Sequence, residues 1–327
     1  MNITSDALLT DLYELTMAQA YLAQGMTDIA VFEFFVRKLP PQRNFFMAAG
    51  LEQVLSYLEA FQFSDADIAW LDQTGGFRPA SLNALRAMRF TGEVHAMPEG
   101  SLFFPHEPIL RITAPLPQAQ LVETRVMNLL NFQTMVASKA CRSVLVAGDK
   151  PLIDFGLRRA HGAEAGLLAA RAAYLAGLAG TSNVSAGARF GIPIYGTMAH
   201  SFVQAHLDEA EAITHIAEAQ PRNVVLLIDT YDTEAAAEKV VSLASRLNAR
   251  GISIHGVRLD SGDLADHARK VRHILDRGGL TATQILASGN LDEERIQTLV
   301  TGQAPIDSFA IGTAMTTSAD APYLDCA

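Results

Sequence analysis

Residues Val224–Thr233 read VVLLIDTYDT, an apolar run followed at once by hydroxyl and carboxyl side chains. The apolar part predicts a buried β-strand at Val224–Ile228, and the polar part predicts a turn that leads into a helix. The same succession recurs in the second half of the chain. Further strands are predicted at Pro151–Phe155, Ser182–Val184, Ile192–Tyr195, Ile252–Val257, Thr283–Ala287 and Asp307–Ile311. Helix-like stretches separate most of them, so we expect a parallel α/β sheet, an irregular TIM-like barrel one strand short of complete.

The part of the chain before Gly148 has a different organisation, in which helices alternate with short strands. Helices are predicted at Asp6–Ala23, Gly50–Phe61 and Leu121–Val146, a strand at Ile29–Val36, and short β segments broken by prolines over Glu93–Pro117. We therefore expect an N-terminal α/β domain at residues 1–148 and an α/β barrel domain at residues 149–327.

The composition is that of a globular protein, with 49% hydrophobic and 18% charged residues. The net charge of −10 argues against sequence-independent nucleic-acid binding, which needs a basic surface. The least polar stretch, Ala163–Gly180, contains Glu164 and Arg171 and predicts a packed helix rather than a membrane span. The N-terminus lacks a signal-peptide pattern, and Cys141 and Cys326 lie far apart, so we expect no disulfide framework and a cytoplasmic location.

Chemically capable residues follow the predicted strands at the points where the strands end. They are Phe155 and Arg158, Ser182, Thr197 and His200, Asp229 and Asp232, Arg258 with Asp260 and Asp263, Ser288 and Gly289, and Gly312 and Thr313. Taken singly, each has an ordinary structural explanation as a helix cap, a tight turn or a core residue. These structural explanations are less convincing for the whole set, because the carboxyl ends of parallel strands meet at one edge of a sheet and would bring all of these residues together.

The residue types predict the ligand. Glycine-bearing turns that lead to helix starts suit a phosphate, as at Gly289 and Gly312. Acidic pairs can bind ribose hydroxyls or Mg²⁺. Arg258 can donate two parallel hydrogen bonds to a carboxylate, and Phe155 offers an aromatic ring for stacking. Together these features indicate a sugar phosphate, a metal–diphosphate and a flat aromatic acid.

With these residues in place, the chain resembles the nicotinate phosphoribosyltransferase family. The motifs that carry the resemblance are TDLYELTM at Thr10–Met17, DFGLRR at Asp154–Arg159, GTMAHSF at Gly196–Phe202, VRLDSGD at Val257–Asp263, and Gly312-Thr313. Their order and spacing match the family over nearly all of the chain, so the resemblance is specific.

The resemblance implies a type II phosphoribosyltransferase that works as a homodimer with shared active sites. It implies that nicotinate and phosphoribosyl pyrophosphate are joined to give nicotinate mononucleotide and pyrophosphate, with Mg²⁺. It also implies ATP hydrolysis coupled through a phosphohistidine, which His200 matches, and Asp260 is the second catalytic residue that we assign. No metal ligand set is assigned.

The resemblance also implies the substrate contacts. Tyr13 matches a tyrosine that reaches a neighbouring subunit's site and stacks on the pyridine ring, and Phe155 matches the ring on the other face. Substrate-binding residues are expected at Tyr13, Phe155, Arg158, Ser182, Thr197, Arg258, Ser288, Gly289, Gly312 and Thr313.

Ser182 bears on the choice between nicotinate and nicotinamide. The related nicotinamide-using enzymes resemble this segment but carry an aspartate at this position. An aspartate would accept a hydrogen bond from the amide and repel a carboxylate, whereas Ser182 can donate and leaves Arg258 for the acid. The sequence therefore predicts nicotinate as the substrate.

Two other functions stay open at this point. The first is a phosphoribosyltransferase of another pyridine acid such as quinolinate, whose second carboxylate could be held by Lys139 and Arg142, unless these are simply polar residues of their helix. The second is a catalytically weak ligand-binding relative. It is motivated by the end of the chain at Tyr323–Ala327, before a C-terminal segment that family members carry. Either a shortened version or a naturally short relative would fit that end.

Overall fold

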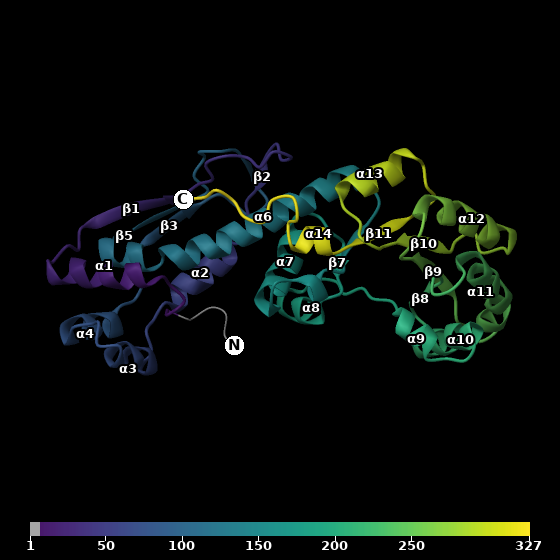
Figure 1. Ribbon diagram of the computed structural model, residues 1–327, viewed down its shortest axis with the longest axis horizontal. Coiled ribbons are helices and arrows are strands. Elements are labelled where there is room, and N and C mark those ends of the chain that lie inside the picture. Colours follow the sequence, from purple (N-terminus) through teal and green to yellow (C-terminus); the bar gives the residue numbers. More distant parts are fainter. Residues whose placement is uncertain (1–6) are drawn as a thin grey trace. The chain divides into compact units, whose positions relative to one another are not determined.

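The computed structural model describes residues 7–327, and the contacts within the chain divide it into two compact units (Figure 1). The first unit comprises the chain up to Ser138 together with Asp320–Ala327, and the second comprises Lys139–Ala319. The division falls inside helix α6 (Glu123–Ala147), which runs without a break to the predicted domain boundary at residue 148. Asp6, where the first helix was predicted to begin, lies outside the described residues, and α1 covers Leu12–Ala23.

The first unit contains an antiparallel sheet in the order β1-β5-β3 and a small two-stranded sheet formed by β2 and β4. The strands are β1 (Ile29–Phe34), β2 (Phe46–Met47), β3 (Glu93–Ala96), β4 (Leu102–Phe103) and β5 (Leu110–Pro115). The helices are α1, α2 (Leu51–Ala60), α3 (Asp65–Gln73), α4 (Pro79–Ala87) and α5 (Leu116–Leu121). An N-terminal α/β arrangement is therefore present, as the sequence predicted.

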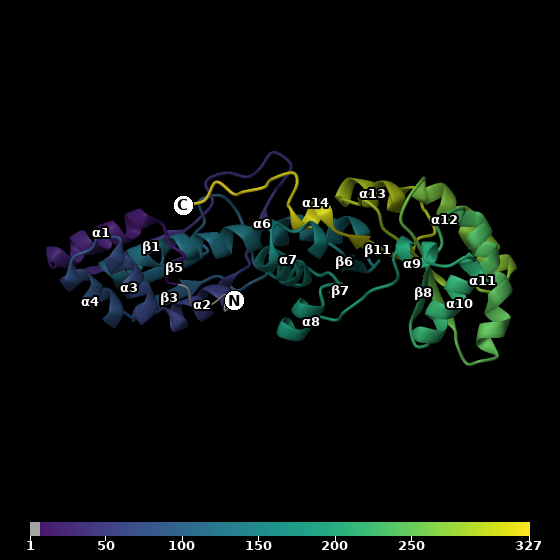
Figure 2. The ribbon, with the colours of Figure 1, turned by 60° about the horizontal axis from the view of Figure 1, so that its bottom comes forward.

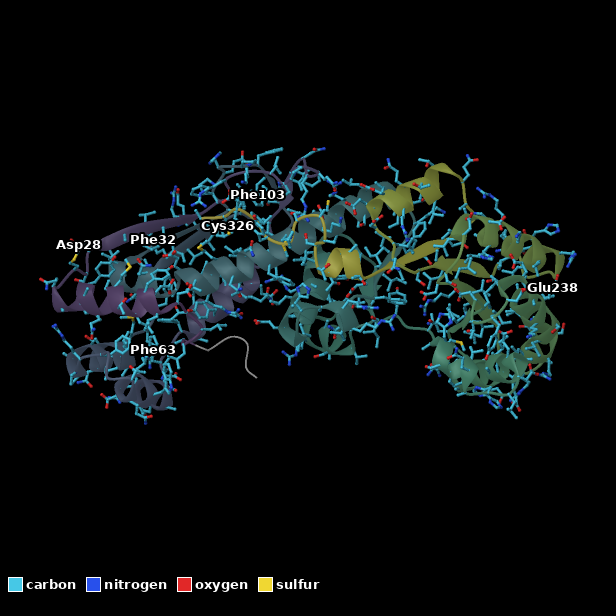
Figure 3. The ribbon with its side chains drawn as sticks, in the orientation of Figure 1. Asp28, Phe32, Phe63, Phe103, Glu238 and Cys326 are labelled. Atoms are coloured by element: carbon cyan, nitrogen blue, oxygen red, sulfur yellow. The ribbon has the colours of Figure 1, made fainter. Side chains whose placement is uncertain are left out.

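Aromatic side chains fill the core of this unit. The rings of Tyr57, Phe61 and Phe63 meet edge to face, with centroids 5.7 Å apart in each successive pair. Phe103 of β4, which is labelled in Figure 3, packs against Phe46 of β2, and both rings are fully buried. Such ring pairs contribute stabilisation beyond the apolar area that they bury.

The last residues of the chain belong to the first unit. Ala327 exchanges two backbone hydrogen bonds with Phe35, at 2.9 and 3.0 Å. Asp320 accepts hydrogen bonds from the Nε and Nη2 atoms of Arg43, both at 3.1 Å, in a buried ion pair. These contacts explain why Asp320–Ala327 groups with residues that lie almost three hundred positions earlier.

The second unit is built on a six-stranded parallel sheet in the order β7-β6-β11-β10-β9-β8. Its strands are β6 (Leu152–Asp154), β7 (Gly180–Thr181), β8 (Val224–Leu227), β9 (Ile254–Leu259), β10 (Gln284–Ala287) and β11 (Ser308–Ile311). The sheet is open between β7 and β8, its two end strands. The prediction of an irregular, incomplete TIM-like barrel is confirmed.

Helices cover the strands of this sheet: α11 and α12 pack on each other (Figure 2), α12 also contacts β9 and β10, and α10 contacts β8. The helices of this unit are α7 (Ala163–Leu175), α8 (Val184–Phe190), α9 (His200–Gln204), α10 (Glu209–Ala219), α11 (Thr233–Asn248), α12 (Leu264–Arg277), α13 (Glu293–Thr301) and α14 (Thr313–Thr316), with a 3₁₀ turn at Leu157–Arg159. Acidic side chains cap several of them, since Asp232, Asp263 and Asp292 accept from backbone N–H groups of α11, α12 and α13.

Two predicted strands of this unit are wrong. The prediction at Ser182–Val184 fails because β7 ends at Thr181 and the Asn183 side chain accepts from Ala186 N, which starts α8 at Val184. The prediction at Ile192–Tyr195 fails because only Ile194 forms a bridge, parallel to Thr181. The gap in the barrel lies where this strand was expected.

Two further expectations concern membranes and thiols. Among residues 7–327, no helix combines the length and the apolar character that a membrane span needs, and α7 ends after 13 residues. Both Cys141 and Cys326 are free thiols.

Candidate active site

The carboxyl ends of the parallel strands surround a cavity of about 400 Å³ in the second unit. It is lined by Phe155, Leu157, Arg158, Ser182, Gly196, Thr197, Met198, Ala199, His200, Arg258 and Asp260. Most of the predicted site residues that follow β6, β7 and β9 are thus brought together at one place, as are Thr197 and His200.

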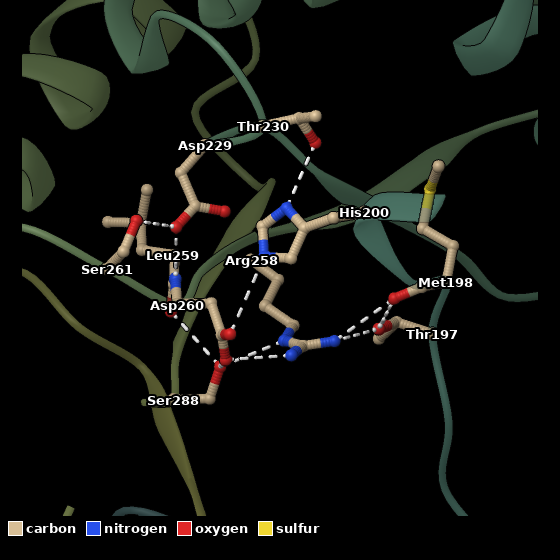
Figure 4. Close-up of polar contacts among 10 residues, drawn as sticks. All are labelled: Thr197, Met198, His200, Asp229, Thr230, Arg258, Leu259, Asp260, Ser261 and Ser288. Carbon is tan, nitrogen blue, oxygen red and sulfur yellow. Dashed lines mark hydrogen bonds and ion pairs between the residues drawn. The ribbon is translucent and has the colours of Figure 1, made fainter. Parts of the chain in front are cut away.

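Arg258 is the centre of the polar network in this cavity (Figure 4). Its Nε atom donates to Ser288 Oγ at 2.9 Å, and its Nη1 atom donates to Thr197 Oγ1 at 2.9 Å and to the Met198 carbonyl at 3.2 Å. Its Nη2 atom donates to Asp260 Oδ1 at 2.8 Å. These bonds hold the guanidinium plane in place, 5.5 Å from the centre of the Phe155 ring.

Asp260 is held as a carboxylate by this network. Burial opposes its ionised form, but hydrogen bonds from Ser288 and Arg258, with the positive charge of Arg258, outweigh burial and lower the pKa of Asp260. The backbone N–H of Asp260 donates to Asp229 Oδ2 at 2.8 Å, and Ser261 Oγ donates to the same oxygen at 2.6 Å. Asp229 therefore fixes the turn that carries Asp260.

His200 is the first residue of α9, and its two ring nitrogens have different neighbours. Nδ1 lies 3.1 Å from Thr230 Oγ1, and Nε2 lies 3.6 Å from Asp260 Oδ2. The ring is partly exposed and lines the cavity. An imidazole placed beside a carboxylate in an open cavity can exchange protons or accept a phosphoryl group.

Phe155 and Ser182 are placed by the buried Asp154, which precedes Phe155 at the end of β6. Asp154 accepts from Gly156 N and from Thr181 Oγ1, both at 2.7 Å. Burial raises the pKa of Asp154, although these two hydrogen bonds oppose the shift. Asp154 thereby joins the ends of β6 and β7, which carry the predicted stacking ring and the predicted serine.

The predicted phosphate turns lie beside the cavity rather than on its lining. Gly289 has a φ of +93°, and a Cβ atom at this position would lie 1.9 Å from the carbonyl oxygen of Asp260, so only glycine fits. Ser288 before it is buried and bonded to Arg258. Gly312 comes close to the backbone of Phe155 and precedes the exposed Thr313 at the start of α14.

Tyr13 belongs to the other unit, on α1. It is 46% exposed, and its hydroxyl donates to Glu123 Oε1 at 3.2 Å. Partial burial and the carboxylates of Glu123 and Glu14 raise the pKa of Tyr13. The exposed ring is available to a ligand or a second chain, which is the property that its predicted role requires.

Four polar residues considered from the sequence have structural partners instead. Lys139 Nζ lies 2.9 Å from the buried Glu293 carboxylate, and Arg142 Nε donates to the same group at 3.0 Å. The simpler interpretation of Lys139 and Arg142, as polar residues of their helix, fits these contacts. Asp232 and Asp263 are helix caps.

Sequence reasoning missed the partners that orient the site. Thr230 and Asp229 were recognised only as strand-end residues, and the Met198 carbonyl was not considered. The presence of Asp229 and Asp260 at the ends of two successive strands is a signal for their contact, whereas the sequence carries no signal for the contacts of Thr230 and the Met198 carbonyl.

Comparison with known proteins shows which family this chain resembles. Residues 8–131 match the family described as nicotinate phosphoribosyltransferase N-terminal domain, and residues 151–326 match the nicotinate phosphoribosyltransferase family. A nicotinate phosphoribosyltransferase of Mycobacterium tuberculosis is 50% identical over 98% of this chain and 69% of its own length. That of Bacillus subtilis is 43% identical over 97% of this chain and 65% of its own length.

A solved structure shows the same architecture. The crystal structure of human nicotinic acid phosphoribosyltransferase superposes with a TM-score of 0.87 at 32% identity, covering 97% of this chain and 73% of the human chain. Matches of this extent cover both units and every motif quoted above. The chain therefore belongs to the nicotinate phosphoribosyltransferase family.

Proposed function

We propose that the protein joins nicotinate to phosphoribosyl pyrophosphate, forming nicotinate mononucleotide and releasing pyrophosphate. The observation that carries the proposal is the position of Arg258, fixed by Thr197, Ser288 and Asp260 in a cavity that also holds the Phe155 ring. A cation beside an aromatic ring matches a flat aromatic acid. The relatives named above carry the same activity in their names.

The carboxylate of nicotinate would meet Arg258 and Ser182. The four contacts of the guanidinium leave one N–H on Nη2 without a partner among the described residues. Ser182 lines the same cavity and can add a hydroxyl donor. The acid therefore gains donors on binding, whereas the amide of nicotinamide would set N–H groups against them.

Departure of pyrophosphate leaves positive charge on the sugar carbon, so the site must hold the ring nitrogen in line and stabilise the leaving group. Mg²⁺ would be held mainly by the substrate phosphates, because Asp260 lines the cavity but Asp229 does not, and no three His, Cys, Asp or Glu side chains among the described residues are grouped to hold a metal ion. Mg²⁺ is typically held by few carboxylates together with substrate phosphates. When bound, it would neutralise charge on the diphosphate.

The proposal also includes coupling to ATP hydrolysis, assembly as a homodimer and a cytoplasmic location. His200 is the residue that we propose accepts a phosphoryl group from ATP, since it is partly exposed and faces the cavity. A homodimer would use the exposed Tyr13 ring in the site of a second chain. The two free thiols suit a reducing cytoplasm.

The test is product formation by the purified protein with phosphoribosyl pyrophosphate and Mg²⁺. Nicotinate, nicotinamide and quinolinate are supplied separately, each with and without ATP, and the nucleotides are separated by chromatography. We expect nicotinate mononucleotide from nicotinate, with ATP increasing the yield and His200→Ala abolishing that increase. No nucleotide from any pyridine would contradict the proposed activity, and an ATP effect that survives in His200→Ala would contradict the role of His200.

A further inference from the structure

The side chain of Thr181 joins the two strand ends that carry Phe155 and Ser182. Thr181 is the last residue of β7, is fully buried, and does not line the cavity. Its Oγ1 atom donates to Asp154 Oδ2 at 2.7 Å and accepts from the backbone N–H of Asn183 at 3.0 Å. The hydroxyl thus uses both its donor and its acceptor capacity, one on each strand end.

Two side-chain turns enclose the residues proposed to bind the pyridine acid. Asp154 Oδ1 accepts from the backbone N–H of Gly156 at 2.7 Å, which closes a turn around Phe155. The Thr181 hydroxyl accepts from the backbone N–H two residues further on, which closes a turn around Ser182. The hydrogen bond between Thr181 and Asp154 connects these two turns into one unit.

The backbone supports this connection. Asp154 and Thr181 are paired in the register of β6 and β7, and the Ser182 N–H donates to the Asp154 carbonyl at 2.8 Å. Both side chains are buried, so water does not readily replace the bond between them. The branched Thr181 side chain also has few rotamers to choose from. The Phe155 ring and the Ser182 hydroxyl are therefore held at a fixed relative position.

We propose that Thr181 is a positioning residue that fixes the Ser182 hydroxyl relative to the Phe155 ring and thereby sets the preference for the acid over the amide. This inference rests on the proposed function, in which Phe155 stacks on the pyridine ring and Ser182 donates to its carboxylate. Stacking fixes the plane of the pyridine, and with it the place where the carboxylate lies. A displaced Ser182 then loses its bond to the acid, since hydrogen bonds weaken steeply with poor geometry.

The test compares variants of Thr181 with a matched control. Thr181→Val keeps the shape but lacks the hydroxyl, and Thr181→Ser keeps the hydroxyl. Thr181→Ala is used beside Thr181→Val, because its smaller side chain leaves room for water at the buried Asp154 carboxyl and so spares the fold. Thr283→Val is the control. Thr283 is buried directly before β10, at the opposite end of the sheet from the cavity, and donates to the Ile254 carbonyl at 3.2 Å.

Two readouts are taken. The first is kcat and KM for nicotinate and for nicotinamide, at fixed phosphoribosyl pyrophosphate, Mg²⁺ and ATP. The second is the hydrogen-exchange rate of the Gly156 backbone N–H without substrate, measured by NMR. Gly156 is bonded to Asp154 and not to Thr181, so its exchange rate reports whether Thr181 holds the turn on the other strand end.

In Thr181→Val and Thr181→Ala we expect the ratio of kcat/KM values, nicotinate over nicotinamide, to fall roughly fivefold to tenfold, the effect of one lost hydrogen bond. The fall should come mainly from a higher KM for nicotinate, and exchange at Gly156 should become faster. Thr181→Ser should retain the ratio and the exchange rate of the unmodified enzyme, and Thr283→Val should change neither. A loss of folded protein alone would lower kcat for both pyridines alike.

An unchanged ratio, or an unchanged Gly156 exchange rate, in both Thr181→Val and Thr181→Ala would overturn the inference. The same change of ratio in Thr283→Val would also overturn it. Failure of the proposed function looks different. The unmodified enzyme would then form no nucleotide from nicotinate, while the exchange rate of Gly156 would still decide whether Thr181 holds the turn around Phe155.

Discussion

The Nη2 atom of Arg258 lies 2.8 Å from the Oδ1 atom of Asp260, and the other oxygen of that carboxylate lies 3.6 Å from Nε2 of His200. One carboxylate thus connects the cation proposed to bind the substrate acid with the histidine proposed to be phosphorylated. A substitution at Arg258 or Asp260 should therefore affect both ends of the site. The predictions below depend on this connection and on the turns that hold it.

Replacing Arg258 with lysine should weaken nicotinate use strongly. Lysine keeps the charge but cannot reproduce the planar contacts to Ser288, Thr197 and Asp260. We expect kcat/KM for nicotinate to fall about 10- to 100-fold, the value of one or more charged hydrogen bonds. Steady-state kinetics checks this, with Arg269→Lys on α12 as the control because Arg269 bonds the Gly302 carbonyl outside the cavity. Unchanged kinetics in Arg258→Lys would remove Arg258 from substrate binding.

Replacing Ser182 with aspartate should shift the preference from the acid towards the amide. A carboxylate at the cavity wall repels nicotinate and accepts from the amide of nicotinamide. The ratio of kcat/KM values, nicotinamide over nicotinate, should rise by about tenfold or more. Ser185→Asp is the matched control, because Ser185 is exposed on α8 and does not line the cavity. An equal change in both variants would show a general effect of charge rather than a role of Ser182.

Replacing Gly289 with alanine should disrupt the site as well as the fold. The added Cβ atom would lie 1.9 Å from the Asp260 carbonyl oxygen, so the turn that carries Asp260 must move. Gly279→Ala is the control, because Gly279 also has a positive φ, +78°, but its Cβ atom would meet open space. We expect a loss of about 1 kcal/mol in the free energy of unfolding for Gly279→Ala and about 2 to 4 kcal/mol for Gly289→Ala. Urea unfolding measures this, and equal losses would contradict the argument.

Asp154 and Asp260 should give opposite pH dependences of stability, because their pKa shifts have opposite signs. The pKa of Asp260 is lower in the folded protein than in the unfolded chain. Its carboxylate therefore stabilises the fold at pH values above the unfolded pKa, and this stabilisation is lost as pH falls through the folded pKa. The pKa of Asp154 is raised in the folded protein, so the effect is the reverse. Its protonated carboxyl group stabilises the fold at pH values below the unfolded pKa, and this stabilisation is lost as pH rises through the folded pKa.

Asp260→Asn and Asp154→Asn test this, because asparagine keeps the shape of the side chain and does not titrate. The stability advantage of the unmodified protein over Asp260→Asn should shrink as pH falls below about 4, and its advantage over Asp154→Asn should shrink as pH rises above about 4. Chemical unfolding across this range gives both differences. Parallel curves for the two variants would contradict the assigned shifts.

The sequence predicted the barrel well where apolar runs are continuous, as at Val224–Ile228, which the structure has as β8 at Val224–Leu227. It failed at Ser182–Val184, because the cap at Asn183 starts a helix there. It failed at Ile192–Tyr195 because a strand needs a neighbour along its length, and only Ile194 has one. Local pattern does not report such tertiary pairing.

The site was predictable as a set of strand-end residues but not as a network. Arg258 and His200 could be recognised from type and position, whereas the contact of His200 with Thr230 depends on how α9 lies against the residues that follow β8. The support that Asp229 gives to Asp260 depends on how the ends of β8 and β9 align. Register between parallel strands separated by a helix is set by packing, which one sequence does not show.

The most direct measurement is the kcat/KM of the purified protein for nicotinate and for nicotinamide, at fixed phosphoribosyl pyrophosphate and Mg²⁺. The proposed pocket, with Arg258 and Ser182 as donors, predicts nicotinate mononucleotide formation and a preference for the acid on the order of 100-fold or more. Equal turnover of the acid and the amide, or no turnover of nicotinate, would contradict the account.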